Sequence, residues 1–335
     1  MKKQTGDITL FLTDFPFRSP EVERLRGALG DTALLTVRGE QALSETLAAH
    51  PETDVICTLY PPDNLHELAP NLAWVALASA GADHVLRQSW THAPRTPRFI
   101  TTASGVHAIP ISEHVFSAML LWARQWPEML KLQARRAWPD EAGKQALAGR
   151  ELAGATLLVV GLGAIGRRVA QLGRAFGMRV VATRRHVAAN ASDPDVDVLL
   201  QLDHLAEGLA QADYVALAVP STPDTHHLIG ADQLAQMKPG ALLINIARGE
   251  VVDEPALIAA LKSGPIGAAA LDVAEQEPLP SNSPLWRMPN VMISPHVSGR
   301  TPHYGERLAD LLIDNIARYR AGQPLRNMVD VTRGY

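Results

Sequence analysis

Short apolar runs alternate with helix-like segments along the first hundred residues. Strands are predicted at residues 8–12, 33–37, 55–59, 74–78 and 99–101. Between some of these runs, the sequence predicts helices at 21–29 and 42–50. Alternation of this kind is typical of a parallel sheet covered by helices, so we expect an α/β domain at the start of the chain.

A second alternating series begins near residue 155 and continues almost to residue 295. Its strands are predicted at 155–160, 179–182, 214–219, 241–246, 266–270 and 291–293. The same rhythm of short strands and intervening segments predicts another doubly wound domain. The predicted fold class is therefore α/β, with two doubly wound parallel-sheet domains.

Two helices and an arm decide how these domains are divided. A long apolar helix is predicted at 111–124 and is expected to bridge the domains, with Pro110 at its entry. Residues 134–150 contain Trp138, a proline and two glycines, and are expected to form a surface arm. The amphipathic helix predicted at 302–322 is expected to pack back onto the first domain.

The length of the chain supports this division. Single hydrophobic cores stop growing at about 250 to 300 residues, and this chain has 335. We expect a substrate domain formed by residues 1–104 plus 300–335, which is discontinuous in sequence, and a dinucleotide-binding domain formed by residues 105–299. A cleft between the two domains is the expected place for chemistry.

Composition and charge narrow the classes of function. The chain is 47% hydrophobic and 20% charged, with a net charge of −4, so it offers no basic face for nucleic acid. Cys57 is the only cysteine, so the chain cannot form a disulfide framework within itself. No metal site is expected. A single cysteine is consistent with a reducing, cytoplasmic compartment. No apolar stretch reaches the roughly 18 residues that a membrane span needs. A small-molecule substrate is therefore the expected partner.

A glycine turn joins the first strand of the second series to the helical run after it. The sequence reads Gly161-Leu-Gly163-Ala-Ile-Gly166. Gly161 permits a tight turn, Gly163 lets backbone N–H groups approach a pyrophosphate, and Gly166 lets the helix pack closely on the strand. The helix N-terminus then faces the anion. A glycine turn that binds nothing is the alternative, but the strand-to-helix context favours a dinucleotide.

The residues after the next strand bear on the choice of cofactor. Thr183, Arg184 and Arg185 stand where an acidic residue would bind the ribose 2′-hydroxyl of NAD. With no carboxylate at this strand end and two guanidinium groups, the pocket is predicted to favour the 2′-phosphate of NADP. If the arginines are only solvated surface charge, both cofactors would be used.

Three later segments carry charged residues where apolar strands meet loops. They contribute Arg248, Glu277 and His296. Reduction of a 2-keto acid needs a cation to hold the carboxylate and an acid to protonate the developing alkoxide. Arg248 and His296 match these needs, and a carboxylate such as Glu277 would favour the imidazolium. Each residue taken singly has a structural reading, as a surface cation, a helix-terminal acid or a loop histidine; their joint position downstream of a dinucleotide turn favours catalysis.

These motifs resemble those of the D-isomer-specific 2-hydroxyacid dehydrogenases over nearly the whole chain. Further matching segments begin at Ala78, Gly105, Ser112, Glu151, Val219 and Met237. The resemblance implies a flavodoxin-like substrate domain and a Rossmann cofactor domain that flank a cleft, usually in a homodimer. The expected activity is hydride transfer between NAD(P)H and a small 2-keto acid.

The resemblance also implies roles for individual residues. Arg248 would bind substrate, His296 would act as acid and base, and Glu277 would be its partner. Backbone amides at Ala80 and Gly81 would hold the substrate carboxylate. The implied cofactor-binding residues are Gly161, Gly163, Ala164, Ile165, Gly166, Thr183, Arg184, Arg185, Pro220, Thr225, Ile246, Gly299 and Asp272, the last on the nicotinamide side. Structural roles are expected for Asp83, His107, Glu113 and His114.

Departures from the family pattern refine the expected activity. The run Thr183-Arg184-Arg185 resembles the corresponding segment of NADP-using glyoxylate and hydroxypyruvate reductases. Glu277 stands where formate dehydrogenases of this superfamily have glutamine, which argues against formate oxidation. The main alternative is a nucleotide-sensing binding protein that resembles the C-terminal-binding corepressors, which keep the same three residues. A methyltransferase or flavoprotein would leave the Arg248, Glu277 and His296 set unexplained.

Overall fold

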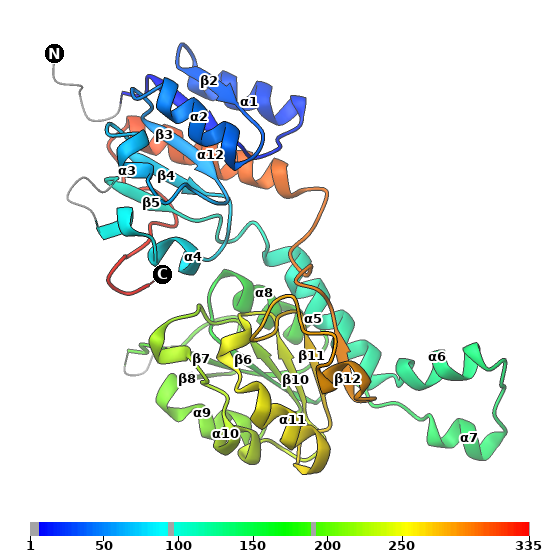
Figure 1. The fold of residues 1–335 in the computed structure, drawn as a ribbon. Helices are drawn as coiled ribbons and strands as arrows, with labels where there is room; N and C mark the ends of the chain where they lie inside the picture. The colour runs from blue at the N-terminus through cyan, green and yellow to red at the C-terminus, as the bar shows by residue number, and fades with distance from the viewer. Residues whose placement is uncertain (1–6, 93–96, 189–191, 335) are drawn as a thin grey trace. The chain divides into compact units, whose positions relative to one another are not determined.

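The computed structural model describes residues 7–92, 97–188 and 192–334. The chain divides into two compact units (Figure 1). Unit 1 consists of Met1–His107 and Arg300–Tyr335, and unit 2 consists of Ala108–Gly299. Each unit contains a parallel sheet with interleaved helices, which confirms the predicted α/β class.

In unit 1 the described residues form a five-stranded sheet in the order β2-β1-β3-β4-β5, parallel throughout. The strands are β1 (Leu10–Thr13), β2 (Ala33–Thr36), β3 (Val55–Thr58), β4 (Trp74–Leu77) and β5 (Phe99–Thr101). The helices are α1 (Ser19–Leu29), α2 (Glu40–Ala49), α3 (Leu65–Leu68), α4 (Asp83–Leu86), the short 3₁₀ turn η1 (Ser89–His92) and α12 (Tyr304–Arg320).

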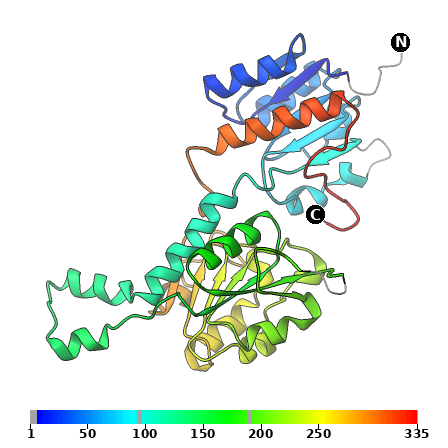
Figure 2. The same cartoon turned by 180° about the vertical axis from the view of Figure 1, so that it is seen from behind.

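The C-terminal helix α12 completes unit 1 as its apolar spacing predicts. It lies beside α1, as both Figure 1 and Figure 2 show. Leu308, Leu312 and Ile316 are buried among side chains of the unit 1 sheet. Apolar burial thus ties the last thirty or so residues to a domain that begins at the other end of the chain.

The boundary between the units differs by three residues from the sequence-based one. Residues up to His107 belong to unit 1, whereas the sequence analysis ends that segment at residue 104. The Ser104 carbonyl accepts a hydrogen bond from Asn327, Val106 is buried in the unit 1 core, and the ring of His107 packs on Tyr304. These contacts with the C-terminal segment are invisible in the local pattern.

In unit 2 the described residues form a seven-stranded parallel sheet in the order β12-β11-β10-β9-β6-β7-β8. The strands are β6 (Thr156–Val160), β7 (Arg179–Arg184), β8 (Val198–Gln201), β9 (Tyr214–Leu217), β10 (Leu242–Asn245), β11 (Ala268–Leu271) and β12 (Val291–Ile293). The α-helices are α5 (Ala108–Ala123), α6 (Trp126–Ala134), α7 (Glu141–Ala146), α8 (Ala164–Ala175), α9 (Leu205–Leu209), α10 (Ala231–Gln236) and α11 (Glu254–Ser263). The 3₁₀ turns are η2 (Leu202–His204), η3 (Pro223–Thr225), η4 (Gly249–Val251) and η5 (Pro284–Arg287).

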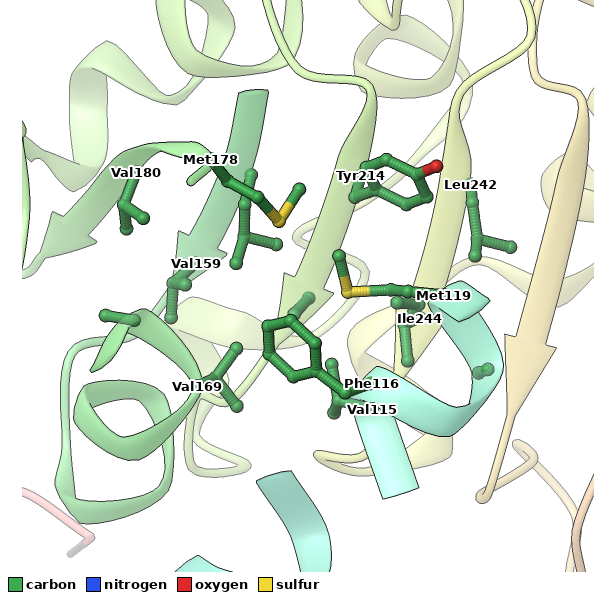
Figure 3. Close-up of a cluster of buried hydrophobic side chains, with 14 of the residues drawn as sticks. Val115, Phe116, Met119, Val159, Val169, Met178, Val180, Tyr214, Leu242 and Ile244 are labelled. Atoms are coloured by element: carbon green, nitrogen blue, oxygen red, sulfur yellow. The ribbon is translucent and has the colours of Figure 1, made fainter. Parts of the chain in front are cut away.

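Helix α5 covers one face of this sheet. Figure 3 shows Phe116 and Met119 of α5 pointing toward the strands that carry Val159 and Tyr214. The helix also packs against α8, the helix that follows the glycine turn. It begins at Ala108, three residues earlier than its apolar pattern predicts, because Pro110 fits within the first turn, where no N–H is needed.

The arm begins earlier than residue 134 and contains two helices that the sequence pattern does not predict, so it comprises residues 126–150 with α6 and α7. The helices α6 and α7 project from the rest of unit 2 in both ribbon views, and neither contains a buried residue (Figures 1 and 2). The analysis also missed the edge strand β8, whose side chains are only half-buried or exposed. Both failures have one cause, since apolar periodicity reports burial and these elements bury little within the chain.

Two negative findings apply to the described part of the chain. None of its helices is long and apolar enough to cross a membrane. Within the same residues, no group of three or more histidine, cysteine, aspartate or glutamate side chains has an arrangement that could hold a metal ion.

Candidate active site

The order of strands in unit 2 brings the predicted site residues to one edge of the sheet. The neighbouring strands β10, β11 and β12 are followed by the loops that carry Arg248, Glu277 and His296 respectively. On the other side of β9, strand β6 leads into the glycine turn and β7 ends at Arg184. Successive strands are added on one side of β6 up to β8 and on its other side from β9 onward, and the carboxyl edge at such a switch in strand order is where doubly wound sheets bind ligands.

His296 and Glu277 form a direct pair. The distance between His296 Nδ1 and Glu277 Oε2 is 2.7 Å, and both side chains are partly exposed. The second oxygen of Glu277 accepts a hydrogen bond from the backbone N–H of Ala274, at 3.2 Å. A carboxylate at Nδ1 orients the ring and leaves Nε2 for another partner.

The backbone at His296 adopts an uncommon conformation that the neighbouring loop supports. Its φ angle is +52°, in the left-handed region that non-glycine residues seldom occupy. The His296 N–H donates to the carbonyl oxygens of Asp272 and Ser294, at 2.8 and 3.0 Å. These bonds hold the imidazole on a defined turn immediately after β12.

Asp272 is the buried anchor of the same loop. Its carboxylate accepts hydrogen bonds from the Ser294 hydroxyl at 2.6 Å and from the backbone N–H groups of Val297 and Ser298 at 3.0 Å each. Burial raises the pKa of Asp272, but these hydrogen bonds favour the charged form more strongly, so the net pKa lies below its ordinary value. The structure therefore connects Asp272 to the loop that positions His296, in addition to its predicted place beside the cofactor.

Arg248 stands at the start of the turn after β10. Its Nη1 donates to the Ala247 carbonyl at 2.8 Å, and its own carbonyl accepts from the Asn245 side chain at 2.9 Å. A Cβ on the next residue, Gly249, would lie 1.9 Å from the Ala274 carbonyl oxygen. Only glycine permits this approach, which brings the Arg248 turn against the segment that carries Glu277.

The glycine turn fits a dinucleotide phosphate. A Cβ on Gly161 or Gly166 would collide with backbone oxygen, at 2.7 and 2.0 Å, whereas a Cβ on Gly163 would meet nothing within 4 Å. Gly163 is also the N-cap of α8, and no side chain caps that helix. The N-terminus of α8, formed by Ala164, Ile165 and Gly166, thus presents backbone donors beside open space, as pyrophosphate binding requires.

The end of β7 and the residue after it have carboxylate neighbours that the sequence pattern does not predict. Thr183 is fully buried and its carbonyl accepts from the N–H groups of Gly161 and Leu162, so it supports the glycine turn. The analysis counts no carboxylate at this strand end, yet the fold supplies two from elsewhere in the chain. Arg185 pairs with Asp224, and Arg184 lies 3.9 Å from Asp193.

The two carboxylates differ in their surroundings. Asp193 is 7% exposed and is already bound by Arg167, whose guanidinium also binds Asp195. Those bonds lower the pKa of Asp193 despite its partial burial. Asp224 is 60% exposed, and exposed ion pairs contribute little. Asp193, which faces Arg184, therefore already has a closer partner in Arg167. Asp224, which faces Arg185, forms only a weak, exposed ion pair with it.

The remaining predicted cofactor residues lie on the same edge of unit 2. The hydroxyl of Thr225 donates to the Pro220 carbonyl at 2.7 Å and accepts from the Thr222 N–H, which closes the loop after β9. Ile246 is buried directly after β10, and Gly299 is the final residue of unit 2.

Ala80 and Gly81 lie in unit 1, in the loop after β4. The Ser79 hydroxyl donates to the Gly81 carbonyl at 2.8 Å, and the Ala78 carbonyl accepts from the Tyr304 hydroxyl. The loop is thus shaped by contacts within its own unit, at the carboxyl edge of the smaller sheet.

Sequence reasoning missed one contact at the site. Ser294 Oγ lies 3.2 Å from His114 Nε2 and donates to Asp272. The sequence pattern favours a structural role for His114, and its contact with Ser294 connects α5 to the His296 loop. The only sign of this contact in the sequence is that Ser294 lies two residues before His296.

The family follows from comparison with known proteins. Residues 116–298 match the family model of the D-isomer specific 2-hydroxyacid dehydrogenase NAD binding domain. This chain belongs to the D-isomer-specific 2-hydroxyacid dehydrogenase family. It is accordingly an oxidoreductase that transfers a hydride between a nicotinamide cofactor and 2-hydroxy acids or the corresponding 2-keto acids. The comparisons give no support to the corepressor alternative.

Relatives extend the match beyond that domain. The chain is 33% identical to the glyoxylate reductase of Aeropyrum pernix over 291 residues, covering 83% of each protein. It is 36% identical to glyoxylate/hydroxypyruvate reductase B of Pectobacterium atrosepticum over 273 residues, covering 78% of this chain and 80% of the relative. The crystal structure of a D-isomer specific 2-hydroxyacid dehydrogenase from Xanthobacter autotrophicus, in complex with NADPH and MES, superposes with a TM-score of 0.83 at 30% identity, covering 98% of this chain and 99% of the other.

Proposed function

We propose that this dehydrogenase reduces small 2-keto acids such as glyoxylate and hydroxypyruvate, with NADPH preferred over NADH. The observation that carries the proposal is the 2.7 Å contact between His296 and Glu277 on the sheet edge that also carries Arg248 and the glycine turn. The relatives named as glyoxylate and glyoxylate/hydroxypyruvate reductases support the choice of substrates.

Each residue of the proposed triad has a distinct task. The Arg248 guanidinium binds the substrate carboxylate, which fixes the position of the neighbouring carbonyl. The His296 Nε2 donates its proton to the carbonyl oxygen as negative charge develops there. Glu277 holds the ring through Nδ1 and stabilises the imidazolium before the transfer. When bound, the reduced nicotinamide supplies the hydride that completes the 2-hydroxy acid.

The cofactor is proposed to lie along the carboxyl edge of the unit 2 sheet. The N-terminus of α8 binds the pyrophosphate, and Arg184 and Arg185 bind the 2′-phosphate. Support comes from the open space beside Gly163 and from the NADPH named with the Xanthobacter autotrophicus structure. The other proposed cofactor contacts are Thr183, Pro220, Thr225, Ile246, Asp272 and Gly299. The backbone at Ala80 and Gly81 is proposed to contribute to carboxylate binding.

A homodimer is also proposed, and the arm supports it. Helices α6 and α7 contain no buried residue, and the Trp138 side chain between them is 89% exposed. Helices of this length are marginal without tertiary packing, so a second copy of the chain is the proposed cover. Light scattering should give the mass of two chains, and deletion of residues 126–147 should give one. A monomeric wild-type protein would contradict this part of the proposal.

The decisive experiment for the activity is a steady-state assay. NADPH oxidation is followed at a fixed enzyme concentration with glyoxylate, hydroxypyruvate, pyruvate and longer 2-keto acids, and then repeated with NADH. The proposal expects the highest kcat/KM with glyoxylate or hydroxypyruvate and with NADPH. Turnover confined to longer 2-keto acids would refute the substrate assignment, and equal kcat/KM with both cofactors would refute the preference.

A further inference from the structure

His227 joins two loops of the candidate active site. Its backbone N–H donates to the Glu250 carbonyl at 2.8 Å, in the turn directly after Arg248. Its Nε2 lies 2.6 Å from Glu275 Oε1, in the segment that ends at Glu277. The φ angle at His227 is +49°, another left-handed non-glycine residue. Such conformations persist where the surrounding structure determines them, and they gather at functional sites.

Glu275 is held from a second direction. Its Oε1 also accepts from the Glu254 backbone N–H, and its own N–H donates to Glu254 Oε2, both at 3.4 Å. Burial raises the pKa of Glu254, and the negative charge of Glu275 adds to this, against the opposing hydrogen bond from the Glu275 N–H. His227 Nε2 and the Glu254 N–H thus meet at the same oxygen of the Glu275 carboxylate.

The segment from Ala274 to Glu277 is held on more than one side. Its Ala274 carbonyl is pressed against Gly249, so the chain is fixed on that side by the Arg248 turn. The Ala274 N–H donates to Glu277 Oε1, which directs Oε2 toward His296. Displacement of Glu275 would therefore shift the residue that hydrogen-bonds to Glu277.

We propose that His227 and Glu275 form a clasp that positions the Glu277 carboxylate against His296. Neither residue touches the reacting atoms, so both are positioning residues for the reduction, and the inference rests on the proposed function. Glu254, Glu250 and His226 are the nearby titratable groups among the described contacts. Glu250 accepts a hydrogen bond from the Ser221 hydroxyl, and the His226 ring lies 4.0 Å from that of His227.

The test compares variants on both sides of the clasp. His227→Ala and Glu275→Ala should each lower kcat roughly 10- to 100-fold, the scale expected for misplacing a catalytic group, while KM for NADPH stays within about twofold. His227→Gln retains an N–H donor at a similar reach and should recover most of the kcat. His204→Ala is the matched control, because His204 pairs with Glu207 on the surface of the same unit and should leave kcat unchanged.

Epistasis distinguishes positioning from a general structural effect. In a Glu277→Gln background the clasp has no carboxylate to position, so His227→Ala should cause no further loss of kcat. If His227→Ala lowers kcat by the same factor in both backgrounds, or if His227→Gln is as impaired as His227→Ala, the proposal is overturned.

Amide hydrogen exchange separates this inference from the proposed activity. A peptide spanning residues 272–279 should exchange faster in His227→Ala and Glu275→Ala than in the wild type, with no change in His204→Ala. If the wild type reduces no 2-keto acid, the proposed function fails, and the exchange data still decide whether the clasp exists. Unchanged exchange in both clasp variants would contradict the clasp whatever the activity.

Discussion

The two ends of the unit 2 sheet edge are built by different forces. At β10 to β12, the groups around His296 are held by hydrogen bonds to the backbone and by the buried Asp272. At β7, the guanidinium groups of Arg184 and Arg185 lie against carboxylates and are about 40% exposed, and Arg184 also donates to the Leu162 carbonyl at 3.3 Å. The first arrangement keeps its geometry without a ligand, while the second can exchange partners when an anion arrives.

This difference predicts where mutations should matter most. Proton transfer is sensitive to displacements of about 0.5 Å between donor and acceptor, so the proposed catalytic residues near β10 to β12 benefit from rigid, buried support. Recognition of a 2′-phosphate depends chiefly on charge, which flexible side chains supply at low cost in packing.

The largest effect is expected for His296→Ala. It removes the general acid and should lower kcat by about 100-fold or more. Because the proposed contacts with the pyrophosphate and the 2′-phosphate lie on other loops, the dissociation constant of NADPH, measured by fluorescence titration, should stay close to that of the wild type. A variant that retains most of its turnover would remove His296 from the mechanism.

Arg248→Ala should affect both substrate binding and the chemical step. The lost charge-assisted contacts contribute about 1.5 to 3 kcal/mol, which corresponds to a loss of roughly 10- to 150-fold in kcat/KM for the 2-keto acid. The loss should divide between a higher KM and a lower kcat, because the guanidinium acts in the ground and transition states. If only the affinity for NADPH changed, the assignment of Arg248 to the substrate would be wrong.

Changing both Arg184 and Arg185 to alanine should have a smaller and more selective effect. We expect KM for NADPH to rise about tenfold while KM for NADH hardly changes, because only NADPH carries the additional phosphate. The salt dependence of NADPH binding should also decrease. Arg174→Ala is the control, since Arg174 forms a similarly exposed pair with Asp197. A double variant that still prefers NADPH would show that selectivity arises elsewhere.

The smallest effect is expected on stability, from Asp272→Asn. The folded-state pKa of Asp272 is depressed, so its carboxylate contributes stability that is fully present above the unfolded pKa near 4 and is lost as the pH falls through the folded pKa. The variant should lose about 1 kcal/mol of unfolding free energy at pH 7. Urea unfolding at pH 7 and at pH 3 should show this difference shrinking at the lower pH. A difference that grows on acidification would refute the account.

Much of the candidate site could be predicted because its residues occupy strand ends. The glycine turn, Arg248 and His296 each follow an apolar run, and strand ends in a doubly wound sheet converge on one edge. The pairing of Arg185 with Asp224 and the bonds from His227 to Glu275 could not be predicted in this way. Each joins loops that follow different strands, so their contact depends on strand order rather than on local pattern.

The alternation of strands and helices, the glycine turn and the residue types of the proposed triad could be read from the sequence, because they follow from local periodicity and side-chain chemistry. Only the folded chain shows which carboxylates face Arg184 and Arg185, how Asp272 supports the His296 loop, and that residues 105–107 belong to unit 1. The arm shows the same limit, since its helices bury nothing within the chain. Hydrogen bonds and ion pairs between distant segments leave no periodic trace, so only the folded chain reveals them.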